Sequence, residues 1–303
     1  MSSKPGCLKP ALMGCLGLII VIVLGLGVMA AIAWRGVGRQ DVQEQVREGA
    51  VEVLSGAAPA DAARAYPAGR VILDLGQGEF HVHRGEPNTG VRVKARFDQN
   101  SHELVDDLET LPDGTWVYRV RYRQTIPMMQ ALMQALMGAD AESRVDIYLP
   151  PDAPVALELN QHEGGAELEL GGLWLTELVV DAVRGGCAIS VAEPLREPAE
   201  RVILGGSMGG MEVVGVGNLS PRELKVSWHM GGAEIDLSGQ WRRSCDIEAR
   251  IKMGGLALIA PKDVPLREVP MDAPLGGAAP EADTLELRLR RSSDRGEIDI
   301  VRR

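Results

Sequence analysis

Short runs in which apolar and polar residues alternate recur along the chain from residue 70 to residue 263. Leu224-Lys-Val-Ser-Trp228 and Ala233-Glu-Ile-Asp-Leu237 are two of them. Alternation with a period of two residues is typical of a β-strand that buries one face and exposes the other. The pattern therefore predicts an all-β domain over residues 70–263.

A glycine pair punctuates the alternating runs at a nearly constant interval. Glycine adopts positive φ without steric cost, which suits a chain that doubles back once per unit. We predict a β-solenoid-like stack of Gly-Gly repeats of about 22 residues, in which each unit buries its apolar face against its neighbours. The pairs recur every 21 to 24 residues, at Gly164-Gly165, Gly185-Gly186, Gly209-Gly210, Gly231-Gly232 and Gly254-Gly255.

One aliphatic position follows each glycine pair at the same offset. Strands stacked about 4.8 Å apart would place these side chains in a ladder. We predict that the ladder forms the core and that function lies on a surface of the stack. The position is the third residue after the second glycine: Leu168, Ile189, Val213, Ile235 and Leu258.

Residues 11–34 form an uncharged apolar run after a short head, residues 1–10. As a helix the run is about 36 Å long, enough to cross a hydrocarbon core of about 30 Å. A cleaved signal peptide is the alternative, because Ala31-Ile-Ala33 resembles a cleavage site, but such peptides have an apolar region of about 7 to 15 residues. We predict a single-pass transmembrane helix, which makes the lipid bilayer a partner of the chain.

Basic residues flank the apolar run on both sides, with Lys4 and Lys9 before it and Arg35 and Arg39 after it. The charge rule for membrane topology therefore gives no clear orientation. A very short head and a long acidic C-terminal portion favour a cytoplasmic head. We predict a cell-membrane protein whose C-terminal β-domain is extracytoplasmic.

Residues 35–69 connect the apolar run to the β-domain. The spacing of Val42, Val46 and Val53 predicts a short juxtamembrane helix. The residues that follow, 56–69, are rich in Ala and Pro and are typical of a linker.

Two stretches before the glycine pairs also predict strands. Residues 71–83 repeat the order of strand, glycine and strand, and in residues 116–122 aromatic and apolar side chains alternate with arginines. We expect the face made of Trp116, Tyr118, Val120 and Tyr122 to pack on the stack and the arginine face to meet solvent.

Glu79, His81 and His83 alternate along one predicted strand, so their side chains share a face. A His-x-His pair on a strand is a known arrangement of zinc ligands. The alternative is a solvated face, because Phe80 and Val82 take the core positions. We predict no metal and no cofactor, and these three residues are the candidate ligands if a metal binds.

The β pattern is interrupted at residues 126–138, where apolar side chains recur at helical spacing. We predict an inserted Met-rich helix that caps the β-stack. A methionine-rich stripe is also an adaptable binding surface, which makes this one a candidate partner surface. Its members are Met128, Met129, Leu132, Met133, Leu136 and Met137.

The C-terminal part begins with residues 264–283, which are rich in Pro, Gly and Ala and predict a linker. Residues 284–303 return to alternation and predict a terminal β-hairpin. Arginines on these strands block edge-to-edge pairing, and a basic contact for an anionic cell-wall polymer is the alternative role. They are Arg288, Arg290, Arg291, Arg295, Arg302 and Arg303.

Two motifs resemble a known family. Val145-Asp-Ile-Tyr-Leu-Pro-Pro151, followed by the Gly-Gly units, resembles the bacterial adhesin-like and toast-rack β-domains, and residues 253–264 are similar to the terminal signature of the cell-wall-antibiotic-response domain of envelope-stress proteins. The resemblance covers about residues 70–263. It implies a single-pass bacterial envelope protein with a right-handed β-stack, and the Met-rich insertion departs from the family pattern.

Composition and charge exclude several functions. The net charge of −10 argues against nucleic-acid binding, which requires a basic face. The five histidines form no nucleophile-base motif, and Ser207 and Ser238 follow glycine without a nucleophile elbow. Residues 205–210 lack the Lys-Ser/Thr of a phosphate-binding loop. We predict no catalytic and no cofactor-binding residues.

The sequence therefore predicts a membrane-anchored, non-enzymatic β-solenoid at the cell envelope, acting as an adhesin-like binding, stress-sensing or scaffold domain. A membrane partner protein or a cell-wall polymer is the expected partner. The alternative is a polysaccharide-acting enzyme, because β-solenoids also carry such sites on a strand face. That function requires acid and base groups along one groove.

Cys187 and Cys245 lie outside the apolar run. If each unit is one layer, they are about three layers or 14 Å apart. A disulfide requires Cα atoms within about 7 Å of each other. We predict that both cysteines are unpaired, with Cys187 near a turn and Cys245 in or beside a strand.

Overall fold

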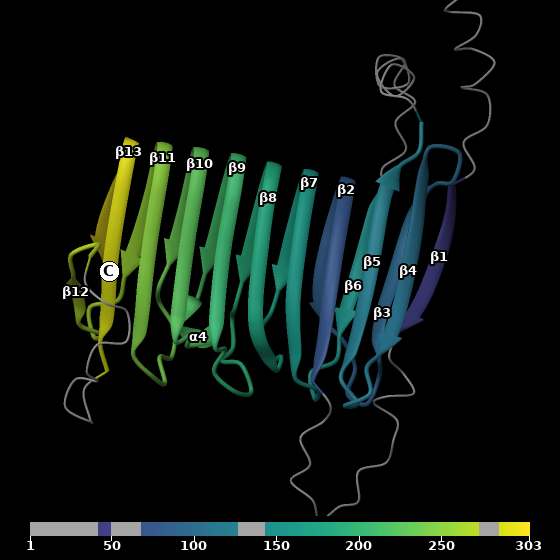
Figure 1. Ribbon diagram of the computed structural model, residues 1–303, viewed down its shortest axis with the longest axis horizontal. Helices are drawn as coiled ribbons and strands as arrows, with labels where there is room; N and C mark the ends of the chain where they lie inside the picture. Colours follow the sequence, from purple (N-terminus) through teal and green to yellow (C-terminus); the bar gives the residue numbers. More distant parts are fainter. Residues whose placement is uncertain (1–41, 50–67, 127–142, 273–284) are drawn as a thin grey trace, which may run out of the picture.

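The computed structural model describes residues 42–49, 68–126, 143–272 and 285–303. These residues form a mixed sheet of thirteen strands and a short helix. The strands stand side by side along the length of the molecule (Figure 1). The elements are β1 (Val42–Gly49), β2 (Gly69–Arg84), β3 (Val91–Asp98), β4 (His102–Thr110), β5 (Trp116–Gln124), β6 (Arg144–Leu149), β7 (Val155–Glu169), β8 (Leu175–Ser190), β9 (Arg201–Val214), α4 (Val216–Leu219), β10 (Glu223–Asp236), β11 (Cys245–Ala260), β12 (Leu266–Glu268) and β13 (Leu287–Arg302).

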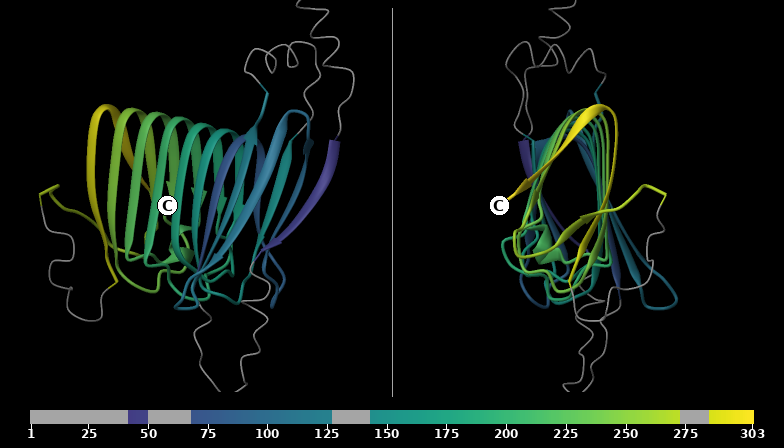
Figure 2. Two further views of the ribbon diagram at one scale, coloured as in Figure 1. Left: turned by 45° about the vertical axis from the view of Figure 1, so that its right-hand side comes forward. Right: turned by 90° about the vertical axis from the view of Figure 1, so that its left-hand side faces the viewer.

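Long strands form the central row in the order β2-β7-β8-β9-β10-β11-β13, and each neighbouring pair is parallel. Each strand arches over near its middle, so that it has a first half before the bend and a second half after it (Figure 2). The first halves form one wall of the molecule and the second halves form the facing wall. Apolar side chains from both walls fill the space between them.

The glycine pairs lie in register at this bend. Gly209, Gly231 and Gly254 are neighbours across β9, β10 and β11. Gly209 has a φ of 123°, and a Cβ added to it would lie 1.9 Å from the carbonyl oxygen of Gly185 on β8. The first glycine of each pair is therefore required, because both the backbone conformation and the adjacent strand exclude a side chain.

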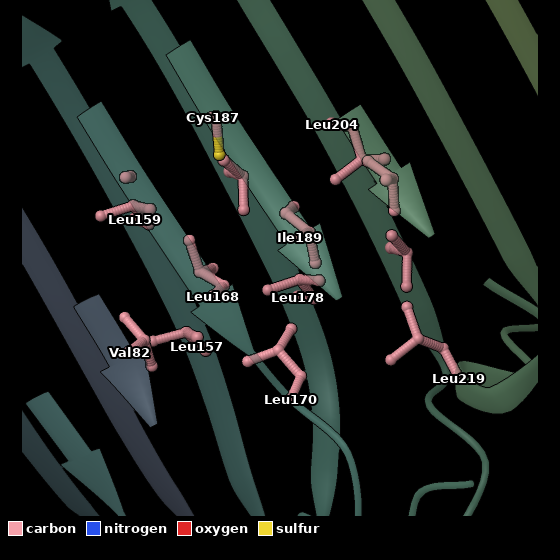
Figure 3. Close-up of a cluster of buried hydrophobic side chains, with 14 of the residues drawn as sticks. Val82, Leu157, Leu159, Leu168, Leu170, Leu178, Cys187, Ile189, Leu204 and Leu219 are labelled. Carbon is pink, nitrogen blue, oxygen red and sulfur yellow. The ribbon is translucent and has the colours of Figure 1, made fainter. Parts of the chain in front are cut away.

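The predicted aliphatic ladder lies in the core, where successive strands place its members side by side. In Figure 3, Leu168 and Ile189 of the second halves lie close to Leu157 and Leu178 of the first halves. Burying one such side chain is worth about 1.5 to 3 kcal/mol. The ladder residues are at most 2% exposed: Leu168, Ile189, Val213, Ile235 and Leu258.

Aromatic residues fill the N-terminal end of the core. Trp116, Tyr118, Val120 and Tyr122 of β5 are at most 1% exposed, as the alternation predicts. β5 pairs with the first half of β2 on one side and with β4 on the other. The ring of Tyr122 meets the ring of Phe80 edge-on, with 5.9 Å between the centroids.

The predicted juxtamembrane helix is wrong for the part of it that the structure describes. Residues 42–49 form β1, which pairs antiparallel with β3. β3 pairs with β6 on its other side and so offers an open edge. Gly49 lets the backbone of β1 pass the Tyr118 ring, which an added Cβ would meet at 2.3 Å. Strand pairing at this edge outweighs the weak helical spacing of the valines.

The predicted terminal hairpin is instead one long strand. β13 pairs in parallel with β11 on both sides of Gly296. The bend at Gly296 carries the strand to the facing wall, so its hydrogen bonds go to the adjacent layer and not back onto itself. The predicted linker at residues 264–283 contributes β12, which pairs with the first half of β13.

Two sequence predictions lie outside the described residues. One is the transmembrane helix at residues 11–34, and the other is the Met-rich helix, which is not described from residue 127 onward. Within the described ranges, no helix is long and apolar enough to span a membrane. The candidate partner surface also falls outside the description, since it consists of Met128, Met129, Leu132, Met133, Leu136 and Met137.

Candidate binding groove

A shallow groove crosses the outer surface of the second halves, just after the bend. It has a volume of about 750 Å³ and runs from β7 across the row to β13. It is built mainly from the second glycine of each pair and the two residues that follow that glycine. Five steps between strands about 4.8 Å apart make the groove about 24 Å long.

The floor of the groove is the row of second glycines. A Cβ added to Gly165, Gly186 or Gly255 would meet no atom within 4 Å, and one added to Gly210 or Gly232 would meet only a carbonyl oxygen at 3.9 Å. Packing therefore permits a side chain at every one of these positions. The glycines leave an open channel that the fold itself does not require.

The buried residue after each glycine pair forms the inner side of the groove. At this position Cys187 is 3% exposed and Met211 is 3% exposed. Burial raises the pKa of the Cys187 thiol to about 12. Because the thiolate is the nucleophilic form of cysteine, Cys187 is an inert part of the lining and not a reactive centre.

The outer rim of the groove is acidic and consists of Glu167, Glu212, Glu234 and Asp299. Glu212 and Glu234 are direct neighbours on β9 and β10, although like charges placed opposite each other destabilise a sheet. Within the described residues, Glu212, Glu234 and Asp299 form no ion pair. No basic residue in the described part of the chain therefore neutralises their charges.

The second halves of the five strands β7 to β11, which make up most of the groove, carry no basic residue. Residues 164–170, 185–190, 209–214, 231–236 and 254–260 contain no lysine and no arginine. A channel lined by charge of one sign raises the local concentration of oppositely charged groups. The groove is therefore suited to a positively charged ligand.

The candidate metal ligands lie beside the N-terminal end of the groove. His81 and His83 share the outer face of β2, with their rings stacked at 5.9 Å. Nδ1 of His81 is 3.3 Å from the carboxylate of Glu167, and Nδ1 of His83 is 3.0 Å from that of Glu169. In the described ranges no three side chains are placed to hold a metal ion. The histidines are polar partners of the acidic wall.

Glu79 completes the predicted trio on β2. It does not join the two histidines in a ligand set, because it lies in register with Arg144 of β6. Arg144 also holds Asp146 at 3.0 Å. The carboxylate therefore lies in a basic environment at the border of the acidic wall.

The C-terminal arginines are largely engaged in contacts within the protein. Arg288 lies 2.7 Å from Asp246, and Arg291 lies 3.0 Å from Glu268. Arg290 is only 7% exposed. These contacts leave little of the predicted basic surface for an anionic polymer.

Cys187 and Cys245 are free and buried, as the spacing of the units predicts. Cys245 is the first residue of β11, and Cys187 follows the glycine pair of β8. β8 and β11 are separated by β9 and β10 in the row. The described domain therefore holds together through packing and hydrogen bonds rather than through this disulfide.

Sequence reasoning misses the rim carboxylates, because acidic residues spread along strands look like ordinary solvated faces. Their position relative to the glycine pairs is the signal that identifies them. The residue two places after the second glycine is acidic in three of the five pairs, at Glu167, Glu212 and Glu234, and no basic residue follows on the same half-strand.

The chain is similar in structure to bacterial proteins described as candidate adhesins, over most of its length and at low TM-scores. A candidate cell adhesion protein from Clostridium sporogenes is 10% identical, with a TM-score of 0.35 over 87% of this chain and 100% of that one. A candidate adhesin from Bacteroides fragilis is 10% identical, with a TM-score of 0.31 over 87% of this chain and 98% of that one. A candidate adhesin from Parabacteroides merdae has the same identity and coverage and a TM-score of 0.29.

No protein-family model matches the chain, and no curated protein matches it.

Proposed function

We propose that this chain is a non-enzymatic binding protein of the cell envelope. Residues 11–34 anchor it in the membrane, and the row from β2 to β13 is a β-solenoid domain that presents the groove to an extracytoplasmic ligand. The parallel register of the row supports the solenoid assignment. The observation that carries the binding function is a groove kept open by glycines that packing does not require, beside Glu212, Glu234 and Asp299, which have no ion-pair partner among the described residues.

The shape and charge of the groove define the class of ligand. A channel about 24 Å long accommodates about seven residues of an extended chain. The floor lacks side chains, so it accepts a flat backbone, and the rim favours amino or guanidinium groups. We infer that the ligand is an extended chain with several positive charges.

Titration of the full-length chain in detergent with a heptalysine peptide tests this class. We expect binding that weakens as salt is added, because exposed charges are screened over about 8 Å at physiological ionic strength. A heptaglutamate peptide of the same length is the control and should not bind. Absence of heptalysine binding at low salt would overturn the proposed ligand class.

A polysaccharide-acting enzyme is the second candidate, and the adjacent pair Glu212 and Glu234 is the observation that favours it. Glycosidases use two carboxyl groups about 5 to 10 Å apart, one of which is kept protonated by its surroundings. Both side chains are exposed, so the site lacks the apolar environment that keeps a carboxyl group protonated at neutral pH. If the wild type released new sugar ends from polysaccharides and Glu212→Gln did not, the function would be catalysis rather than binding.

The anchor and its orientation need a separate test. Protease added to intact cells should digest residues 68–303 and leave a membrane-embedded fragment that resists extraction by alkaline carbonate. Release of the whole chain by carbonate would contradict the anchor. Protection of residues 68–303 until the cells are lysed would contradict the extracytoplasmic location.

A further inference from the structure

A ridge of exposed side chains runs along the bends of the row, two residues before the second glycines. Met208 and Met230 are each 44% exposed and are neighbours on β9 and β10, and the half-buried Met253 follows on β11. Arg184 and Arg295 continue the same level on β8 and β13. The ridge is thus an apolar line with a cation at each end.

More cationic charge lies beside the apolar line. Lys252 is exposed next to Met253. Within the described residues, Arg184, Lys252 and Arg295 form no ion pair. The acidic Glu163 and Asp294 lie toward the two ends, at β7 and β13, and leave the middle of the ridge apolar and basic.

The start of β1 lies at the level of this ridge. Strand pairing through β3 and β6 places Glu44 of β1 at the same level as Glu79 of β2. Glu79 is in turn level with the row of second glycines. Val42 precedes Glu44 by two residues and therefore lies level with Met208, which precedes its second glycine by two residues. Figure 1 shows the tail of β1 at the same side of the molecule as the bends.

The chain between the apolar run and β1 is short. Residues 34 and 42 are separated by eight peptide steps, which reach about 28 Å when fully extended. A membrane end at residue 34 therefore holds the bend side of the domain close to the bilayer surface.

We propose that the ridge rests on the surface of the bilayer that holds residues 11–34. This contact rests on the anchor in the proposed function. Met208, Met230 and Met253 enter the boundary between headgroups and acyl chains, while Arg184, Lys252 and Arg295 contact lipid phosphates, the combination used by interfacial membrane surfaces.

The acidic rim lies beyond the bend from the ridge. Glu212 follows Met208 by four residues along β9, a separation of at most about 13 Å because the strand bends between them. Salt screens exposed charges over about 8 Å at physiological ionic strength, which weakens repulsion between the rim and anionic headgroups. The groove therefore opens sideways just above the headgroups, facing ligands at the membrane surface.

Site-specific fluorescence quenching tests the contact in the full-length chain. The chain, with Cys7 and Cys15 changed to serine, carries Met230→Cys with an environment-sensitive label and is reconstituted in vesicles of phosphatidylcholine and phosphatidylglycerol with a lipid-attached quencher. The native Cys187 and Cys245 are buried and stay unlabelled. We expect strong quenching of the label at position 230.

Val214→Cys is the matched control. Val214 is on the same strand as Met208 and is 43% exposed, but lies beyond the bend, six residues or about 20 Å further along the strand than Met208. Its label should be quenched at least about fivefold less. Equal quenching at positions 230 and 214 in a chain that floats with the vesicles overturns the ridge contact and leaves the anchor intact. A chain that does not float overturns both.

A substitution keeps the test independent of any one label. In Met208→Glu combined with Met230→Glu, a label at His229→Cys should lose most of its quenching while the chain still floats with the vesicles. Undiminished quenching there would show that the ridge does not make the contact.

Discussion

The two outer walls of the molecule are made by the same strands and cover the same core, yet they differ in how their charged side chains are paired. On the wall of first halves, acidic and basic side chains neutralise one another across neighbouring strands. On the wall of second halves, Glu212, Glu234 and Asp299 of the groove rim have no ion-pair partner among the described residues, and glycines take the place of side chains.

Glu177 shows the pattern of the first wall. It accepts a hydrogen bond of 2.8 Å from Arg201 on the next strand, and Arg70 lies 3.3 Å from it across β7. Further along the row, Arg288 contacts Asp246 in the same manner. Glu177 and Asp246 on this wall are thus paired with arginines one or two strands away, whereas Arg184 and Lys252, close to the bend, form no ion pair among the described residues.

The difference separates a surface that serves the fold from one that is available to a ligand. Unpaired like charges on adjacent strands lower stability, and open glycines add no packing. The second wall therefore bears a small stability cost that the first wall avoids. A binding function explains why this cost falls on one wall only.

The largest expected effect distinguishes the two glycines of a pair. Gly209→Ala should destabilise the domain by about 3 kcal/mol or more, because it combines a disfavoured φ with a clash against β8. Gly210→Ala should change the free energy of unfolding by less than about 1 kcal/mol. Urea unfolding of both variants measures the difference, and equal losses would show that the open floor is structural after all.

The next effect compares carboxylates on the two walls. Glu177→Gln should cost about 1 kcal/mol, because it removes the partner of two arginines. Glu212→Gln combined with Glu234→Gln should cost nothing or stabilise by a few tenths of a kcal/mol, because it relieves repulsion. Thermal unfolding of the full-length chain checks both variants. A loss of stability in the double variant comparable to that of Glu177→Gln would show that the carboxylates of the two walls do not differ.

The smallest effect concerns the loops between strands, where acidic and basic side chains form pairs as they do on the first wall. The hydrogen bond from Arg243 lowers the pKa of the Glu200 carboxyl. The pair therefore contributes stability above the ordinary carboxyl pKa of about 4.3, and the contribution is lost as the pH falls through the lowered value.

Glu200→Gln should accordingly lower stability slightly at pH 7, by less than about 0.5 kcal/mol because the carboxylate is exposed, and not at all near pH 2. Unfolding midpoints measured for both proteins across this range give the test. A difference that grows toward acid pH would have the wrong sign.

The core is the part of the fold that the sequence predicts best. The period-two alternation and the constant offset from the glycine pairs identify Leu168, Ile189 and Val213 as buried neighbours, because a local pattern decides which side chains point inward. The separation of Cys187 from Cys245 follows from the same unit length.

The errors arise where distant pairing decides the structure. β1 forms because β3 has an open edge and Gly49 passes the Tyr118 ring, which no local pattern reveals. The terminal strand is continuous because Gly296 bends it toward the facing wall. The groove escapes prediction because only the packing between strands shows that Gly209 is required and Gly210 is not.

We infer that the open row of second glycines is the ligand-binding surface. Gly210→Val combined with Gly232→Val fills the middle of the groove with residues that favour strands, at positions where an added Cβ has no closer neighbour than 3.9 Å. Calorimetric titration of this variant and the wild type with heptalysine, together with the unfolding temperature of each, is the most direct test. We expect an affinity at least about tenfold lower at an unchanged unfolding temperature, and an unchanged affinity in the folded variant would show that the second glycines do not form the binding surface.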